Sequence, residues 1–245
     1  MTAPTSKSRP LIIAHRGSSG HEPENTLRAF ELAIAQGADM IELDLHLSHD
    51  DHVVVIHDDD LEGSTDRSGL IASLTLAEIR KADAGKGERV PTLQETLELA
   101  RNRVQLYLEL KGAGVAESAI QAVREFEMVD QVLFASFDMG LMERLGSDHR
   151  DLRLGLILGA DSYDPLVRFR EQFPWIAYRD FNYQFLSLHV RLCRRQSIET
   201  AQKSGKQVFA WTANTEREFS KLTSRGVDGI VTDFPDRLVA FVAGL

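Results

Sequence analysis

Short apolar runs alternate with helix-like stretches along nearly the whole chain, and this alternation limits the possible folds more than any other feature. We expect strands at residues 11–15, 40–47, 104–110, 131–137, 154–158, 175–178, 208–211 and 229–232. We expect helices between them, at residues 27–34, 115–127, 161–173, 187–203, 215–224 and 236–242. Strands that alternate with helices in this way indicate βα units around a parallel sheet.

The number of expected strands favours a closed barrel over an open sheet. Eight βα units would close a (β/α)8 TIM barrel, an α/β fold for which 245 residues is a common size. A doubly wound parallel sheet is the alternative. No Pro/Ser-rich linker, internal repeat or low-complexity tract divides the chain, so we expect residues 1–245 to form one domain.

One region after the second expected strand departs from the alternation. The polar quartet at residues 49–52 separates the apolar runs at 45–47 and 53–57, which favours a hairpin over a crossover. Turn-forming residues follow, with one short expected helix at 75–81. We therefore expect a small insertion at about residues 50–91, between the second barrel strand and the helix that follows it.

The composition argues against several classes of protein. The formal net charge of −9 disfavours general nucleic-acid binding, which depends on clustered Lys and Arg. No apolar stretch approaches the ~20 residues of a membrane span, and residues 1–10 lack the apolar centre of a secretory signal peptide. A single cysteine, Cys193, forbids an intrachain disulfide. We therefore expect a soluble cytoplasmic protein without a nucleic-acid partner, and no oligomeric state is indicated.

Two carboxylates lie two residues apart in the second expected strand. Glu42 and Asp44 therefore project to the same face, where two like charges are costly unless they are neutralised. Glu109 has a similar place near the end of the third expected strand. Oxygen ligands of this kind suit Mg²⁺ or Ca²⁺, with His46 as a minor alternative ligand. The alternative is a core ion pair between Glu42 or Glu109 and Lys111 or an arginine.

Two histidines and several basic or aromatic side chains lie at the ends of other apolar runs. His15 and His57 can divide acid and base work near neutral pH, although a lone strand-end histidine is more often structural. Arg16 offers a guanidinium fork to phosphate oxygens, and Lys111 could face an anion or form a salt bridge. Trp211 either walls a pocket or belongs to the core. In a parallel α/β barrel such strand ends meet at one face, where catalytic groups gather.

Seven short motifs occur in order between residues 13 and 235. They are His15-Arg16-Gly17, Pro23-Glu24-Asn25-Thr26, Glu42-Leu43-Asp44, Val55-Ile56-His57-Asp58, Glu109-Leu110-Lys111, Trp211-Thr212-Ala213-Asn214 and Gly229-Ile230-Val231-Thr232-Asp233-Phe234-Pro235. Any one of them is weak, but in this order and spacing the set resembles the glycerophosphodiester phosphodiesterase family. The resemblance implies a (β/α)8 barrel and a metal-assisted hydrolase that releases sn-glycerol 3-phosphate and an alcohol from a glycerophosphodiester.

The resemblance also implies a role for the histidines and the carboxylates. His15 and His57 would match the acid/base pair of the family. Its metal ligands would be Glu42, Asp44 and Glu109, which would hold one divalent metal ion, Mg²⁺ or Ca²⁺.

The remaining candidate residues would bind the substrate, a small-molecule glycerophosphodiester. Arg16 and Lys111 match the residues of the family that contact phosphate, and Trp211 matches a pocket wall. In the family the glycerol hydroxyl of the substrate is thought to attack phosphorus first, which gives a cyclic phosphate that water then opens.

The stretch after His57 departs from the family pattern. Gly63 stands where the family usually has an arginine, and Arg67 stands where it usually has a glycine. These changes fall in the insertion rather than in the catalytic motifs. Two other functions stay open: a related barrel phospholipase that acts on intact phospholipid, and a non-catalytic barrel that binds a phosphorylated ligand.

Overall fold

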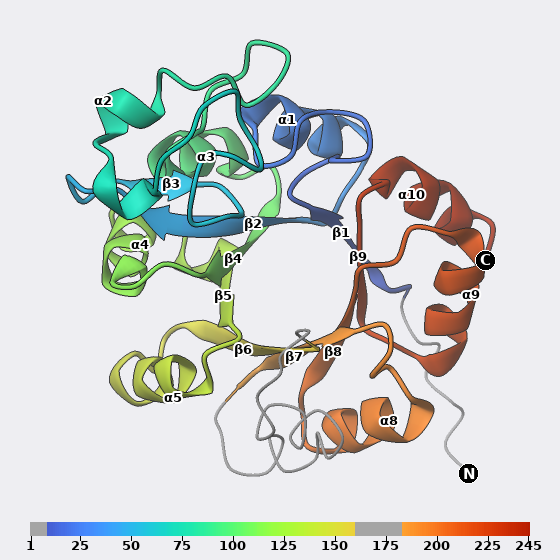
Figure 1. Cartoon of the computed structure of the whole chain (residues 1–245). Helices are drawn as coiled ribbons and strands as arrows, with labels where there is room; N and C mark the ends of the chain where they lie inside the picture. Colours follow the sequence, from blue (N-terminus) through green and yellow to red (C-terminus); the bar gives the residue numbers. More distant parts are fainter. Residues whose placement is uncertain (1–8, 160–182) are drawn as a thin grey trace, which may run out of the picture.

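A closed ring of parallel strands forms the centre of the molecule, and the helices pack around its outside (Figure 1). The computed structural model describes residues 9–159 and 183–245. In these residues the strands of the ring are β1 (Leu11–His15), β2 (Met40–Leu47), β4 (Gln105–Leu110), β5 (Val132–Ser136), β6 (Arg153–Leu158), β7 (Phe185–His189), β8 (Gln207–Trp211) and β9 (Gly229–Thr232). Strand β1 pairs in parallel with both β2 and β9, which closes the ring. The expected (β/α)8 barrel is therefore confirmed, and the open doubly wound sheet is wrong.

Four of the helices lie close to where the apolar spacing predicts them, at residues 27–35, 115–125, 216–225 and 235–243, whereas the helices at 93–100 and 139–148 were not expected from the sequence. Those that cover the outside of the ring are α1 (Leu27–Ala35), α3 (Leu93–Ala100), α4 (Val115–Glu125), α5 (Met139–Asp148), α8 (Arg195–Lys203), α9 (Glu216–Arg225) and α10 (Pro235–Ala243), with a short 3-10 turn η2 (Val129–Gln131) before β5. Side chains fix their first turns: Thr92 and Thr215 each form a reciprocal capping box with the glutamate three residues later. The local sequence thus specifies these helix starts directly.

Strand β7 corrects the expectation for this part of the chain. The helix expected at 187–203 begins only at Arg195, because residues 185–189 alternate as a strand does. Phe185 packs inside the ring, whereas Leu186 and Leu188 pack against the helices outside it. This strand pairs with both β6 and β8. The strand expected at 175–178 and the helix expected at 161–173 lie outside the described residues.

The insertion after β2 starts with the expected hairpin and has a small core of its own. Strand β3 (Val53–Val55) pairs antiparallel with β2, and the turn η1 (Ile71–Ser73) and the helix α2 (Leu76–Ile79) follow. Val54, Ile56, Leu61 and other apolar residues of the segment form a separate buried cluster. Figure 1 shows this segment beside α1 and α3, at the edge of the ring.

Apolar side chains fill the inside of the ring, except at the carboxyl ends of the strands, where polar side chains point inward. The buried inner cluster, which we call the apolar layer, contains Ile13, Met40, Tyr107, Leu133, Ala135, Ile157, Phe185, Phe209 and Val231. In it Phe185 and Phe209 stack with ring centroids 5.0 Å apart. Residues two further along the same strands point to the same inner face, nearer the carboxyl ends. None of the helices described here is long and apolar enough to cross a membrane.

Candidate active site

Strand parity brings four of the expected site residues to one end of the barrel. His15 follows Ile13 by two residues, Glu42 follows Met40 by two, and Glu109 stands in the same way after an inward tyrosine. The strand register places His15 beside Glu42, and Asp44 beside Glu109. The apolar layer therefore supports a charged layer directly beyond it, at the carboxyl ends of the strands.

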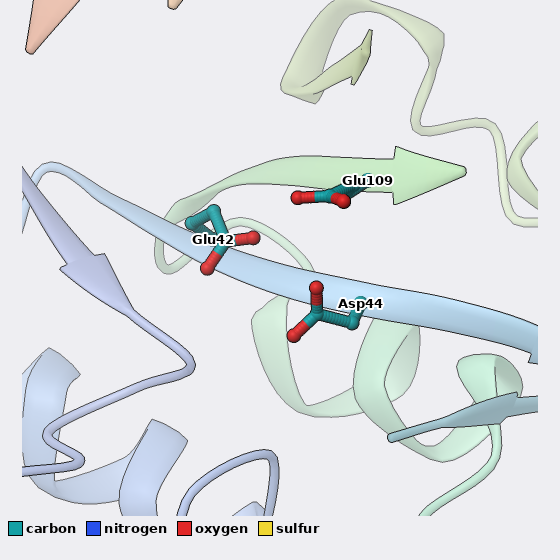
Figure 2. A group of neighbouring side chains, drawn as sticks. All are labelled: Glu42, Asp44 and Glu109. Atoms are coloured by element: carbon teal, nitrogen blue, oxygen red, sulfur yellow. The ribbon is translucent and has the colours of Figure 1, made fainter. Parts of the chain in front are cut away.

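The three expected metal ligands converge on one space between β2 and β4. Figure 2 shows the carboxylates of Glu42 and Asp44 on β2 turned toward the carboxylate of Glu109 on β4. One oxygen from each lies within 4.8 Å of the others. All three side chains are buried, and Asp44 is only 1% exposed. Three carboxylates so close together in a buried place repel one another unless positive charge is near.

Two basic side chains supply part of that positive charge. Arg16 Nε lies 3.2 Å from Asp44 Oδ2, and Lys111 Nζ lies 3.3 Å from Asp44 Oδ1 and 3.6 Å from Glu109 Oε1. The backbone N–H of Arg16 donates to Glu42 Oε2 at 3.1 Å. Of the core ion pairs considered from the sequence, that of Glu109 with Lys111 is present. Among the described residues Glu42 has no such pair, and within the cluster the closest contacts of the two cations are with Asp44. Two cations thus face three carboxylates among the described residues, which leaves the cluster short of positive charge.

The pKa values of the cluster reflect this shortage. Burial raises the pKa of Glu42 well above its usual range, and the charges of Asp44 and Glu109 add to the effect. Burial and the charge of Asp44 raise the pKa of Glu109 to about 7, against the opposing effect of Lys111. Burial also disfavours ionised Asp44, but the nearby cations outweigh it and lower the pKa of that carboxyl. A set of hard oxygen donors that lacks positive charge fits a divalent cation such as Mg²⁺ or Ca²⁺.

The turn after β1 holds Arg16 in place. Arg16 and Asn25 both have left-handed backbone conformations, with φ of 53° and 56°, and Asn25 N–H donates to the Arg16 carbonyl at 3.0 Å. Gly17 has a φ of 82°, and a Cβ there would lie 2.7 Å from the backbone of α1. Glu24 accepts from Arg16 Nη1 at 2.9 Å, and Asn25 Nδ2 donates to Asp44 at 2.9 Å. The guanidinium is therefore oriented before any anion binds.

Each of the two histidines has an aspartate against its Nδ1 atom. His15 Nδ1 lies 2.6 Å from Asp233 Oδ1, and His57 Nδ1 lies 2.7 Å from Asp58 Oδ1. Burial opposes ionised Asp233, but hydrogen bonds from His15 and other donors outweigh it and lower the pKa of this carboxyl. A carboxylate on Nδ1 orients an imidazole and stabilises its protonated form.

These aspartates are functional candidates that the sequence analysis did not single out. Asp58 is the neighbour of His57, so a His-Asp pair at a strand end was the available signal. Asp233 directly follows β9 at the carboxyl end of the barrel. Its partner His15 is 218 residues away in the sequence, so no local pattern links the two.

A cavity of about 160 Å³ collects most of the expected site residues. Its charged and polar lining includes His15, Arg16, Glu42, His57, Glu109 and Lys111, and its apolar lining includes Phe137, Ile157, Trp211 and Val231. Asp44 is absent from the lining because it lies buried behind Arg16 and Lys111. The cavity thus has a charged side and an apolar side.

Trp211 contributes to the apolar side of the cavity and is also fixed by its neighbours. Its Nε1 donates to the carbonyl oxygen of Ser187 at 3.2 Å, and its ring meets Phe137 edge to face at 5.7 Å. Phe137 is 40% exposed, which is unusual for a large apolar side chain in this structure. Trp211 therefore both packs against its neighbours and forms a wall of the cavity, so the two interpretations of this residue apply together.

His46 and Gly63 have other places. The Nε2 atom of His46 lies 3.2 Å from the carbonyl oxygen of His57, and the group of described residues that could hold a metal ion consists of the three carboxylates without His46. Gly63 lies against Asp58: a Cβ at this position would be 2.3 Å from Asp58 Oδ2. The departure at Gly63 therefore leaves room for the carboxylate that holds His57.

Comparisons with known proteins agree with this geometry. The glycerophosphoryl diester phosphodiesterase family matches residues 15–237. The Bacillus subtilis protein YhdW is 38% identical, over 93% of this chain and 96% of its own length. The glycerophosphodiester phosphodiesterase of Caldanaerobacter subterraneus subsp. tengcongensis is 34% identical, over 96% of this chain and 98% of its own.

A solved structure extends the likeness to the fold and to a bound product. The phosphodiesterase of Oleispira antarctica, solved in complex with the product sn-glycerol-3-phosphate, is 31% identical. It superposes with a TM-score of 0.79, over 96% of this chain and 97% of its own. On these matches, and on a closed barrel with acidic and basic groups at one end, the chain belongs to the glycerophosphoryl diester phosphodiesterase family.

Proposed function

We propose that this protein hydrolyses glycerophosphodiesters to sn-glycerol 3-phosphate and an alcohol, with a divalent metal ion and with His15 and His57 as the proton-transfer groups. One observation carries the proposal: two aspartate-held histidines line the same cavity as a three-carboxylate cluster and two basic side chains. The product bound to the Oleispira antarctica relative supports the choice of substrate.

Glu42, Asp44 and Glu109 would hold the metal ion. They fit it because they offer three hard oxygen donors and lack a third balancing cation. When bound there, the ion would polarise a phosphoryl oxygen and neutralise the charge that develops on it. Burial raises the pKa of Glu109, and repulsion by Asp44 adds to the effect, which agrees with a site that lacks positive charge.

Arg16 and Lys111 would bind the phosphate, and Trp211 would bound the rest of the substrate. Both basic groups reach the cavity while they keep their contacts with Asp44. A guanidinium held by Glu24 presents its remaining N–H groups to an anion in a fixed direction. The ring of Trp211 closes the apolar side, where the less polar part of the substrate would lie.

The two histidines would move protons in two steps. In the first, the substrate's own glycerol hydroxyl attacks phosphorus, one histidine takes the hydroxyl proton, and the other gives a proton to the leaving alcohol. In the second, water opens the cyclic phosphate, and the two histidines exchange roles. Both rings are oriented for this exchange, because each has a carboxylate against its Nδ1 atom.

The proposal is tested with purified protein, Mg²⁺ or Ca²⁺, and either glycerophosphoethanolamine or glycerophosphocholine, with enzymatic detection of sn-glycerol 3-phosphate. We expect turnover that a chelator abolishes and that His15→Ala lowers by at least ~10²-fold, as for a lost acid/base group. Full activity in that variant would remove His15 from the mechanism.

Two further arms separate the alternative functions. Faster turnover of intact phospholipid vesicles than of deacylated headgroup diesters would favour a phospholipase. Calorimetric binding of these diesters with no turnover, in the presence of each metal, would favour a non-catalytic barrel. Each of these results would overturn the proposed function.

A further inference from the structure

The side-chain amide of Asn214 has an orientation that its neighbours determine. The hydroxyl of Thr232 accepts from the backbone N–H of Phe234 at 3.1 Å, so its proton is free to donate to Asn214 Oδ1, also at 3.1 Å. The backbone N–H of Asp233 donates to the same Oδ1 at 2.9 Å. Because an amide oxygen only accepts, two donors at this atom identify it, and the NH₂ group points the other way.

The NH₂ group of Asn214 in turn determines what Asp233 can do. It donates to Asp233 Oδ2, while Ser19 Oγ donates to Asp233 Oδ1 at 3.1 Å. An ionised carboxylate only accepts hydrogen bonds. The remaining contact of Asp233 Oδ1, with His15 Nδ1 at 2.6 Å, therefore needs a proton on the histidine nitrogen.

We infer that Asp233 and Asn214 are positioning residues that keep a proton on His15 Nδ1, so that Nε2 is the atom of His15 that takes up and returns protons in the cavity. The inference rests on the role proposed above for His15. Thr232 donates to Asn214, and Asn214 donates to Asp233. His15 must therefore also donate to Asp233, which excludes the other neutral tautomer of the ring.

The variant Asp233→Asn tests whether His15 donates to position 233, because asparagine has almost the same shape as aspartate. Asn214 still presents its NH₂ group, so the new amide must keep its oxygen toward Asn214 and turn its own NH₂ group toward His15. His15 Nδ1 must then accept, and the ring proton moves to Nε2. We expect kcat to fall by about 10²- to 10⁴-fold, the range for a lost or wrongly protonated acid/base group.

The double variant Asp233→Asn with Asn214→Asp should again make His15 Nδ1 the donor in its hydrogen bond with position 233. The carboxylate at position 214 still accepts hydrogen bonds from Thr232 and from the backbone. It now also accepts a hydrogen bond from the NH₂ group of the new amide at position 233. The amide oxygen is then returned to His15 Nδ1. We expect the double variant to recover at least tenfold in kcat over the single variant, a rescue that a merely structural role of Asp233 would not produce.

Nitrogen NMR of the histidine rings reads the tautomer without any need for turnover. It is recorded on the Mg²⁺-loaded protein at a pH where His15 is neutral, and His15→Gln assigns the signal. We expect the proton on Nδ1 in the wild type and the double variant, and on Nε2 in Asp233→Asn. The exposed pair of His21 Nε2 and Asp236, 3.0 Å apart, gives a matched control, since Asp236→Asn should leave kcat unchanged.

The outcomes separate this inference from the proposed function. A wild-type His15 with its proton on Nε2, a single variant as active as the wild type, or a double variant no better than the single one would each overturn the inference. If the wild type turns over no glycerophosphodiester, the proposed function fails, while the NMR spectra still decide the tautomer of His15.

Discussion

The two ends of the barrel interior are built on the same strands but have opposite chemistry. On β2, Met40 belongs to the apolar layer, and Glu42 and Asp44 follow on the same face at intervals of two residues. On β4, Tyr107 is followed in the same way by Glu109. The backbone geometry of the two layers is therefore equivalent. Only the choice of side chain makes the apolar layer stabilising and the charged layer reactive.

The energetic consequence of this contrast is also opposite at the two ends. In the apolar layer, the burial of stacked and edge-to-face aromatic rings such as Phe185 and Phe209 stabilises the folded protein. In the charged layer, three buried carboxylates face two cations, and the pKa of Glu109 is raised to about 7. In the metal-free protein the apolar layer therefore stabilises the fold, and the charged layer weakens it.

Among the variants of the two layers, Glu42→Gln in the charged layer should have the largest effect. This change replaces one of the three carboxylates with a neutral amide, so it removes an anionic oxygen donor and one repelling charge. We expect turnover to fall by at least ~10³-fold, because the charge stabilisation that a bound metal supplies is worth several kcal/mol. At the same time the thermal midpoint of the metal-free protein should rise. Glu98→Gln, on the exposed face of α3, is the matched control and should change neither quantity.

The opposite result is expected from Phe209→Ala in the apolar layer. Deletion of a buried aromatic ring should lower the free energy of unfolding by about 3–5 kcal/mol. The value of kcat per folded molecule should change little, because Phe209 is fully buried and does not line the cavity. Denaturant unfolding together with kinetics on the folded fraction checks both points. A large loss of kcat with unchanged stability would contradict the separation of the two layers.

The stability of the metal-free protein should also depend on pH through the charged layer. The pKa of Glu109 is about 7 in the folded protein and near 4.5 when unperturbed. Between these values the unfolded chain has lost the proton that the folded protein keeps, so rising pH costs the folded state stability. Glutamine cannot ionise. The free energy of unfolding of Glu109→Gln minus that of the wild type should therefore rise from pH 4.5 to about 7, by up to about 3 kcal/mol, and then level off.

Urea unfolding of both proteins at a series of pH values, in the presence of a chelator, measures this difference. A difference that stays flat over this range, or that falls, would mean that Glu109 is not held at a raised pKa by the charged layer.

The smallest expected effect concerns the insertion. A Cβ at Gly63 would lie 2.3 Å from Asp58 Oδ2, so Gly63→Ala should push this carboxylate away from His57. We expect kcat to fall by about tenfold, less than for loss of the histidine itself. Gly244→Ala, where the nearest atom is 3.6 Å from the added Cβ, should have no effect. Equal activity of the two variants would show that Asp58 is not needed against His57.

The sequence was sufficient where the information is local and periodic. Alternating apolar runs predicted most of the ring strands, and the two-residue spacing predicted that Glu42 and Asp44 share a face. It failed for β7, where Ser187 and His189 interrupt a short apolar run and hide the strand pattern. It also could not find the partner of His15, because Asp233 reaches it only through closure of the ring between β1 and β9.

If the charged layer is a metal site, calorimetric titration of the metal-free protein with Mg²⁺ and Ca²⁺ should detect the binding itself. We expect one bound ion per chain in the wild type, and loss of that binding in Glu42→Gln while Glu98→Gln still binds. No binding in the wild type, or equal binding in all three proteins, would contradict a metal site in the charged layer.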